Sequence, residues 1–217
     1  MLKAVNGWPA QVTWSQHREY RYVWRLHWDL EKPPLLVAGL IPSTADEEKE
    51  SLDATVRYCI DIARLPHPEA GEHAANGYGE LIVVNMFARY NTPHHKQARE
   101  VDVRDLVGED NDHHISAQAR DVCERGGTIV AAWGTDGWSR HGRVRSLLCQ
   151  HADELWCFGT RDTEGRTKYG FPCHPGRQGA LRVRPGAVVL KRFCSCLHSR
   201  VRPARQTHPG SDRARGE

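Results

Sequence analysis

Four short apolar runs set the fold that this chain can adopt. They lie at residues 35–41, 81–87, 128–133 and 154–158. Runs of this kind are too short for typical helices and too uniformly apolar for strands with one face in water. Segments with helical spacing of apolar residues separate them, at 47–64, 112–125 and 138–151. Strands that alternate with helices predict an α/β fold with a central four-stranded parallel sheet, covered by helices on both faces.

Residues 1–28 lack such an apolar run. The first 17 residues are weakly patterned, although Trp8 and Trp14 suggest that part of this segment packs on the body. Residues 20–28 alternate large and charged side chains with a period of two. That alternation predicts an edge strand or a half-buried strand.

The length of 217 residues suits one domain with a substantial core. We place this domain at residues 1–193 and a basic tail at 194–217. Residues 191–217 carry seven Lys or Arg against two acidic residues, a net +5, which leaves −2 for the rest of a chain of net charge +3. The tail is predicted to be disordered, and it either attracts phosphates or is simply solvated without a partner.

Composition and cysteine spacing indicate a cytoplasmic protein. Hydrophobic residues make up 39% of the chain, and no apolar run approaches the roughly 20 residues that span a bilayer. The N-terminus also lacks the apolar region of a secretory signal. The seven cysteines form no C-x-x-C pair. We therefore expect reduced thiols and no membrane association.

Two loops beside the predicted strands invite functional interpretations. The loop from Gly39 to Asp46 leads from the first apolar run into a helix, so that its N–H groups and the helix dipole suit an anion. An ordinary turn, with Ser43, Thr44 or Asp46 as the helix N-cap, explains the same residues. The connection at 88–110 is long and polar, and such loops inside compact domains are usually functional or mobile.

The expected site lies where the predicted parallel strands end. Ligands of such sheets bind beyond the carboxyl ends of the strands. The residues that would converge there are Pro42 and Ser43, Asn85, Trp133 and Gly134, and the segment after Gly159.

Five ordered motifs within about residues 18–176 resemble known proteins. They are Gly39-x-x-Pro42-Ser43-Thr44-Ala45-Asp46, Asp53-Ala54-Thr55-Val56-Arg57, Val84-Asn85-Met86-Phe87-Ala88, Ala132-Trp133-Gly134 and His174-Pro175. Together they resemble the DUF1643 family of bacterial and phage proteins. The same landmarks are similar to the uracil-DNA glycosylase superfamily. Its first strand ends in Gly-x-Asp-Pro-Tyr or Gly-x-Asn-Pro-Gly, its second in Asn and its third in Trp-Gly, and a late loop carries His-Pro-Ser.

This second resemblance implies a three-layer α/β/α fold and a DNA glycosylase that needs no metal or other cofactor. Cleavage of an N-glycosidic bond requires a neutral donor near the base oxygen and an anion or activated water near the sugar. By the resemblance, Asn85 would read the edge of a flipped base, and His174 would donate to the base oxygen. The residues expected to grip the DNA backbone are Thr44, Arg161, Lys168 and Arg177, with Ser43 beside them.

The chain departs from the superfamily at the residue before the proline. Ile41 stands where the superfamily has Asp or Asn, and an isoleucine neither polarises water nor stabilises a cation. Asp46 and Asp53 are the candidates for the vacant role. Both also suit an ordinary position near a helix N-terminus, where acidic residues are common.

The residue after the proline suggests the substrate. Ser43 replaces the bulky tyrosine that closes the pocket of uracil-specific enzymes, and a small residue leaves room for a substituent at C5. We therefore expect a base-binding pocket at Ile41, Ser43 and Asn85 for an enlarged pyrimidine, such as a hydroxymethylated or glucosylated cytosine of phage DNA. The 88–110 loop would cap this pocket. Tyr90, or one of Trp133, Trp138 and Trp156, would stack on the base, although these tryptophans are expected mainly in the core.

Other functions fit the same residues. A module that binds a modified base without excising it would explain Ile41 directly, and an enzyme acting on free nucleotides or nucleosides would need no basic tail. A metal site at His94, His95, His113 and His114, with Asp110 and Asp112 nearby, is not favoured, because adjacent histidines do not point the same way. The sequence leaves open whether the protein serves DNA repair or defence against phage.

Overall fold

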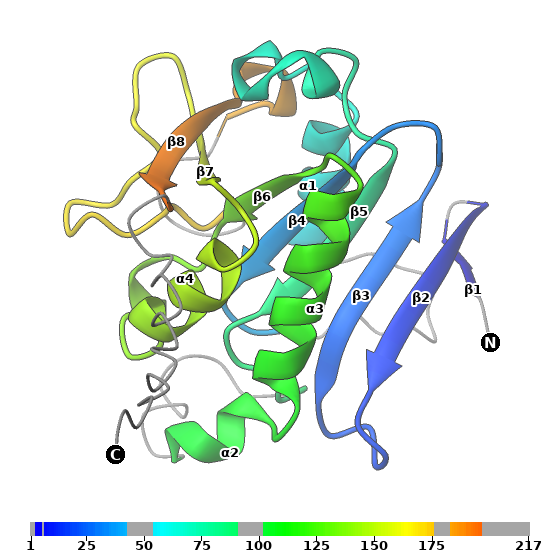
Figure 1. The fold of residues 1–217 in the computed structure, drawn as a ribbon, viewed down its shortest axis with the longest axis vertical. Helices are drawn as coiled ribbons and strands as arrows, with labels where there is room; N and C mark the ends of the chain where they lie inside the picture. Colours follow the sequence, from blue (N-terminus) through cyan, green and yellow to red (C-terminus); the bar gives the residue numbers. More distant parts are fainter. Residues whose placement is uncertain (1–2, 6, 43–53, 91–101, 176–182, 197–217) are drawn as a thin grey trace, which may run out of the picture.

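A computed structural model describes residues 3–5, 7–42, 54–90, 102–175 and 183–196. Within these residues one eight-stranded sheet runs through the molecule in the order β1-β2-β3-β5-β4-β6-β7-β8 (Figure 1). The strands are β1 (Lys3–Val5), β2 (Trp8–Trp14), β3 (Arg21–His27), β4 (Pro34–Gly39), β5 (Glu80–Asn85), β6 (Thr128–Ala131), β7 (Glu154–Gly159) and β8 (Val189–Ser195).

The centre of the sheet is the parallel array that the four apolar runs predict. β4 pairs in parallel with β5 on one side and with β6 on the other, and β6 pairs in parallel with β7. Leu36 and Ala38 of β4 pack on one face, and Leu35 and Val37 pack on the other. Because every side chain of such a strand is buried, its sequence is apolar without alternation.

The prediction of a sheet with four strands is wrong in extent. Antiparallel strands flank the parallel centre, with β1, β2 and β3 beyond β5 and β8 beyond β7. β3 is also not an edge strand, since it pairs with both β2 and β5. Its large side chains are covered on both faces, because Trp24 and Leu26 pack in one core layer whereas Tyr22 and Val23 pack in the other.

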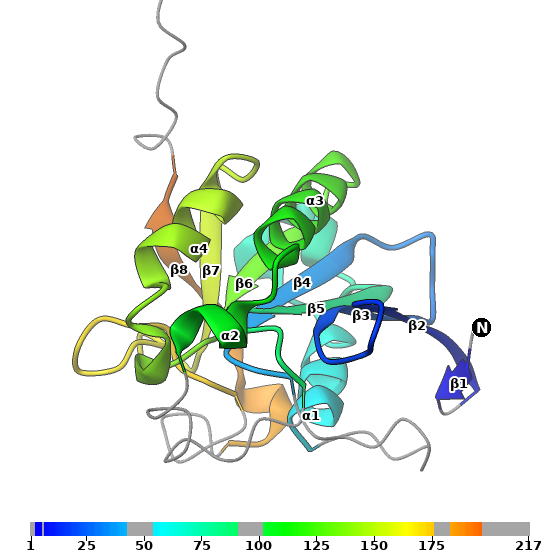
Figure 2. The same cartoon turned by 90° about the horizontal axis from the view of Figure 1, so that it is seen from below.

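Helices cover both faces of the sheet (Figure 2). The α-helices are α1 (Ala54–Ala63), α2 (Val103–Val107), α3 (Asn111–Glu124) and α4 (His141–Cys149). The single 3-10 turns are η2 (Pro68–Ala70), η3 (Glu72–Ala74), η4 (Thr135–Gly137) and η5 (Pro185–Ala187). α1 buries its apolar stripe on one face, and α2, α3 and α4 bury theirs on the other, which gives three layers. No helix among the described residues has the length and apolar character needed to cross a membrane.

The cysteines correct one further expectation. Cys149 and Cys196 form a disulfide, so the prediction that all thiols are reduced is wrong for this pair. The other five cysteines are not in disulfides. β8 continues to Ser195, which extends the folded body past the boundary expected at residue 193.

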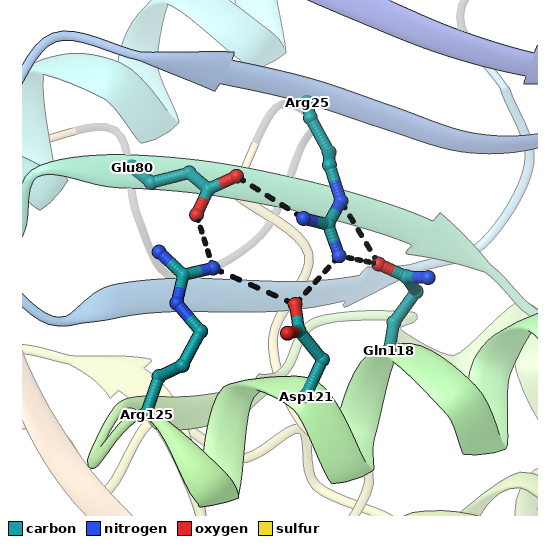
Figure 3. A network of polar contacts seen from close by, with 5 residues as sticks. All are labelled: Arg25, Glu80, Gln118, Asp121 and Arg125. Atoms are coloured by element: carbon teal, nitrogen blue, oxygen red, sulfur yellow. Dashed lines mark hydrogen bonds and ion pairs between the residues drawn. The ribbon is translucent and has the colours of Figure 1, made fainter. Parts of the chain in front are cut away.

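A polar network fastens α3 to the amino-terminal end of the sheet (Figure 3). Glu80, at the start of β5, is buried, and its carboxylate lies 2.6 Å from Arg125 Nη1 and 3.5 Å from Arg25 Nη1. Arg25 of β3 also pairs with Asp121 at 2.6 Å, and its Nε donates to Gln118 at 3.0 Å. The buried carboxylate is thus compensated by two arginines from different elements, and this links β3, β5 and α3.

We predict that Arg125→Ala lowers the free energy of unfolding by about 2 kcal/mol, because it removes the closest cation from a buried carboxylate. Arg192→Ala is the matched control, since Arg192 is 63% exposed and pairs with Glu154 at 2.9 Å. That exposed pair should contribute less than about 1 kcal/mol. Urea denaturation of both variants measures the difference, and equal losses would contradict a special role for the buried network.

Candidate functional site

The ends of β4 and β5 meet as the sequence predicts. Gly39 and Asn85 are neighbours in the parallel ladder, and a Cβ atom on Gly39 would lie 2.8 Å from Asn85 Oδ1. The two chains stay paired beyond the strands, because Met86 N–H donates to Gly39 O and Phe87 N–H donates to Leu40 O, each at 3.0 Å. Because Gly39 has no side chain, the Asn85 amide can occupy the space beside it. Asn85 is buried there, with 5% of its surface exposed.

The end of β6 meets the late loop that carries His174. Gly134 has φ of +70°, and its N–H donates to Pro172 O at 3.0 Å. A Cβ atom at this position would lie 3.3 Å from His174 Cβ. A glycine is required here by both the backbone conformation and the close approach. The segment 172–174 is thereby fixed at the carboxyl edge of the sheet.

The carbonyl group of Met86 accepts hydrogen bonds from residues at the start of two helices. Asn111 Nδ2, at the first residue of α3, donates to Met86 O at 3.1 Å and to Asn85 O at 3.0 Å. Arg140, directly before α4, donates from Nη1 to Met86 O at 2.6 Å. Both side chains are buried. The backbone that carries Asn85 is therefore held from α3 and from the start of α4.

Asp112 balances the charge of the buried Arg140. Its carboxylate pairs with Arg140 through Oδ1 and with Arg143 Nε through Oδ2, the latter at 2.7 Å. Burial alone would raise the pKa of Asp112, but the bonds and charges of Arg143 and Arg140 outweigh burial and lower that pKa. The carboxylate is ionised near neutral pH, and it offsets one of the two positive charges that Arg140 and Arg143 carry.

His141 is held as a neutral donor on the same side of the sheet. Trp133 Nε1 can only donate, and it lies 3.2 Å from His141 Nδ1, so the imidazole carries its proton on Nε2. Burial and the nearby charge of Arg145 lower the pKa of His141. Its ring also packs edge-on against Phe171, at 5.1 Å between centroids. Two histidines, His141 and His174, thus come from elements that meet at Trp133 and Gly134.

Two large aromatic side chains are exposed on segments that follow β6 and β7. Trp138 is 71% exposed and comes directly after η4, and Tyr169 is 64% exposed in the segment that leads to His174. The expectation that Trp138 belongs to the core is therefore wrong, whereas Trp133 is fully buried and Trp156 is partly buried. The turn before Trp138 packs tightly on Met86, since a Cβ atom at Gly137 would lie 2.4 Å from Met86 Sδ.

The structure brings together some of the predicted site residues and separates others. Asn85 and His174 lie at the carboxyl edge, and Ile41 is partly buried against the core at the end of β4. Tyr90 packs edge-on against Trp14, with Arg21 over its ring, so its neighbours belong to the antiparallel strands. Arg161 and Lys168 are exposed in the segment after β7. The predicted residues Ser43, Thr44, Asp46, Asp53 and Arg177 lie outside the described residues.

The predicted histidine pairs have different surroundings. His114 stacks on Tyr22 at 4.6 Å between ring centroids, and its pKa is lowered by burial and by the neighbouring His113. This contact gives His114 a packing role on α3. His94 and His95 lie outside the described residues.

Sequence reasoning missed Asn111, Arg140 and His141, and it considered Asp112 only as part of a metal site. Each occupies the first turn of a predicted helix or the residue before it, where polar side chains are ordinary N-terminal residues. One signal was available, because the first turns of helices that follow parallel strands face the carboxyl edge of the sheet. Polar residues in those turns are therefore candidates for the site.

Comparison with known proteins gives the family. A family model described as a protein of unknown function, DUF1643, matches residues 21–176. The match covers most of the chain, which belongs to the DUF1643 family. Searches of curated proteins and of solved structures found no match. These comparisons do not confirm the resemblance to uracil-DNA glycosylases, which rests on the sequence motifs.

We predict that Gly39→Ala displaces the Asn85 side chain and leaves the fold intact, because the atom that a new Cβ would strike is the end of a side chain. The Asn85 side-chain amide resonances in a nitrogen-proton correlation spectrum should shift. Gly142→Ala is the control, since nothing lies within 4 Å of a Cβ at this α4 position. It should stabilise the protein by up to about 1 kcal/mol and leave the Asn85 resonances in place.

We also predict a pH-dependent contribution from Asp112. A carboxyl group with a lowered folded-state pKa stabilises the protein above its unfolded pKa, which is near pH 4, and this contribution is lost as the pH falls through the folded-state value. The difference in unfolding free energy between the wild type and Asp112→Asn should be full at pH 7 and should shrink below about pH 4. Denaturant titrations at several pH values measure it, and a difference that is independent of pH would contradict the assignment.

Proposed function

We propose that this member of the DUF1643 family is a DNA glycosylase that flips out an enlarged pyrimidine and cleaves its N-glycosidic bond. The proposed substrate is a 5-substituted base, such as the glucosylated hydroxymethylcytosine of phage DNA, and the proposed role is defence against phage. The observation that carries the proposal is the buried Asn85 amide set against Gly39, at the same sheet edge as His174.

Asn85 suits the reading of a flipped base. Its side chain offers one acceptor and two donors, which matches the mixed edge of a pyrimidine. The strand pairing at Gly39 and the bond from Asn111 hold its backbone. An amide that is fixed before the base arrives loses little side-chain entropy on binding.

His174 and His141 suit the stabilisation of a departing base. The base leaves as an anion, and a donor aimed at its oxygen stabilises the charge as it develops. Trp133 fixes the Nε2–H tautomer of His141, and burial lowers the pKa of this residue, so it remains a neutral donor at neutral pH. We assign the direct contact with the base to His174 and a supporting position to His141.

The exposed residues around this edge suit a distorted DNA strand. Arg161 and Lys168 offer positive charge to phosphates. Trp138 and Tyr169 offer exposed rings that can stack on bases or fill the space that a flipped base leaves. Positive charge and exposed aromatic rings on neighbouring segments are the combination that binds unpaired DNA.

Water activation needs a carboxylate that Ile41 does not supply. Asp46 and Asp53 follow Ile41 closely in the sequence, and we assign this role to one of them. The small Ser43 leaves the C5 side of the pocket open to a substituent. Both assignments concern residues outside the described part of the chain.

A module that binds the modified base without excising it is the second candidate function. Ile41 favours it, because its partly buried apolar side chain packs against the core where a catalytic carboxylate would be expected. Binding needs only shape and hydrogen bonds, whereas hydrolysis also needs an activated water.

The experiment compares glucosylated phage DNA with plain DNA of the same sequence. A glycosylase leaves abasic sites, and alkali converts these to strand breaks. We predict breaks in the glucosylated DNA and few in the plain DNA. His174→Ala should slow single-turnover cleavage roughly a hundred- to a thousandfold, the usual loss for one such donor.

The matched control is His17→Ala, which removes an exposed histidine from the turn between β2 and β3. It should cleave at the wild-type rate. Tight binding without breaks would favour the binding module, and a base released only from mononucleosides would favour a nucleoside hydrolase. Unchanged cleavage by a folded His174→Ala variant would remove His174 from the mechanism.

A further inference from the structure

Three cysteines gather at the end of the sheet opposite the candidate site. The Sγ atoms of Cys149, Cys194 and Cys196 all lie within 4.8 Å of one another. Cys149 is the last residue of α4, Cys194 lies in β8, and Cys196 follows that strand. β8 runs antiparallel to β7 at the sheet edge, and Glu154 at the start of β7 pairs with Ser195 (Figure 1). The cluster therefore lies at the amino-terminal end of β7.

Backbone contacts fix the positions of these sulfur atoms. Cys196 N–H donates to Asp153 O at 2.7 Å, in the turn that joins α4 to β7. Cys194 pairs with Leu155 in the β7–β8 ladder. Arg166 donates from Nη2 to Arg192 O at 3.2 Å and also to Phe193 O, and this holds β8 directly before Cys194. The three side chains thus extend from well-held backbone.

Burial separates the cluster from bulk water. Cys149 and Cys196 are buried, and Cys194 is partly buried against the same core cluster. In the structure Cys149 and Cys196 form a disulfide and Cys194 is free. Reduction of that bond would leave three thiols that face one another. Among the described residues, this is also the one group of metal-ligating side chains that could hold an ion.

We propose that the reduced protein binds one zinc ion through Cys149, Cys194 and Cys196. Tetrahedral zinc with Zn–S bonds of 2.3 Å places its sulfur ligands about 3.8 Å apart, and such a site uses three or four thiolates. The 4.8 Å limit on the Sγ separations is close to this spacing, so small side-chain rotations after reduction complete the site. The fourth ligand is a water molecule or another donor that reaches the partly exposed side at Cys194.

Zinc binding requires reduction of the Cys149–Cys196 disulfide first. Two molecules of a monothiol reduce the disulfide, giving the thiols of Cys149 and Cys196 and one molecule of the oxidised monothiol. Zinc then displaces the protons of the three thiols, which leave to solvent, and binds the thiolates. The metal neutralises most of the negative charge of the thiolates, which the buried position would otherwise penalise.

The bound zinc would cross-link two segments, the end of α4 and the end of β8 with the residue that follows it. A site at the opposite end of the sheet from Asn85 and His174 is structural, not catalytic. This proposal does not depend on the proposed function, and an inactive glycosylase assay would leave it unchanged.

The test measures metal content in protein that is produced with zinc and purified under a thiol-free reductant. Elemental mass spectrometry should find one zinc per chain. Cys149→Ser, Cys194→Ser and Cys196→Ser should each lose most of it. Cys123→Ser is the matched control. Cys123 and Cys194 are both partly buried, but Cys123 lies outside the cluster. It should keep one zinc per chain.

A second measurement avoids variants that fail to fold. Wild-type protein loaded with cobalt(II) in place of zinc should show the near-ultraviolet charge-transfer absorption of cobalt bound by thiolates. Oxidised protein with the Cys149–Cys196 bond should bind neither metal. The proposal is overturned if reduced wild type binds no zinc, if it binds iron instead, or if Cys194→Ser retains a full equivalent.

Discussion

The carbonyl oxygen of Met86 is the point on which the carboxyl edge of the sheet depends. It lies just past the end of β5, is buried, and accepts hydrogen bonds from Asn111 and Arg140. A buried carbonyl without partners would cost about 1–3 kcal/mol, so these contacts are required and not incidental. They bring the first turn of α3 and the residue before α4 to the same place. The position of Asn85, one residue earlier, follows from this junction.

The parallel centre of the sheet could be predicted, and its antiparallel flanks could not. The strands β4, β5, β6 and β7 each contain a run of consecutive apolar residues, because helices cover both faces of the sheet, and this pattern predicts buried strands. β8 contains Lys191 and Arg192 at the sheet edge, where charged side chains reach water, and its sequence resembles a basic tail. Edge strands carry mixed patterns because only one face and one ladder are buried.

Strand ends predict part of the candidate site, and long-range contacts determine the rest of its geometry. Asn85 and His174 could be selected because each ends or follows a predicted element. The role of Arg140 depends on its reach to Met86, 54 residues away, which no local pattern encodes. Trp138 is exposed, although the apolar character of its side chain favours the core. Composition favours burial of a tryptophan, and tertiary packing overrides that preference.

The size of the catalytic effect indicates that the proposed reaction needs more than the two histidines at this edge. One well-placed neutral donor contributes about 3–4 kcal/mol of transition-state stabilisation, whereas enzymes supply at least about 8 kcal/mol in total. His174 and His141 together would supply about 6–8 kcal/mol if both acted on the departing base, which only reaches the low end of what enzymes supply. In the proposed mechanism the remainder comes from an acid that stabilises the sugar cation or activates water. With Ile41 at the usual place of that acid, the proposed glycosylase mechanism assigns the role to Asp46 or Asp53, and a protein that only binds the base requires neither.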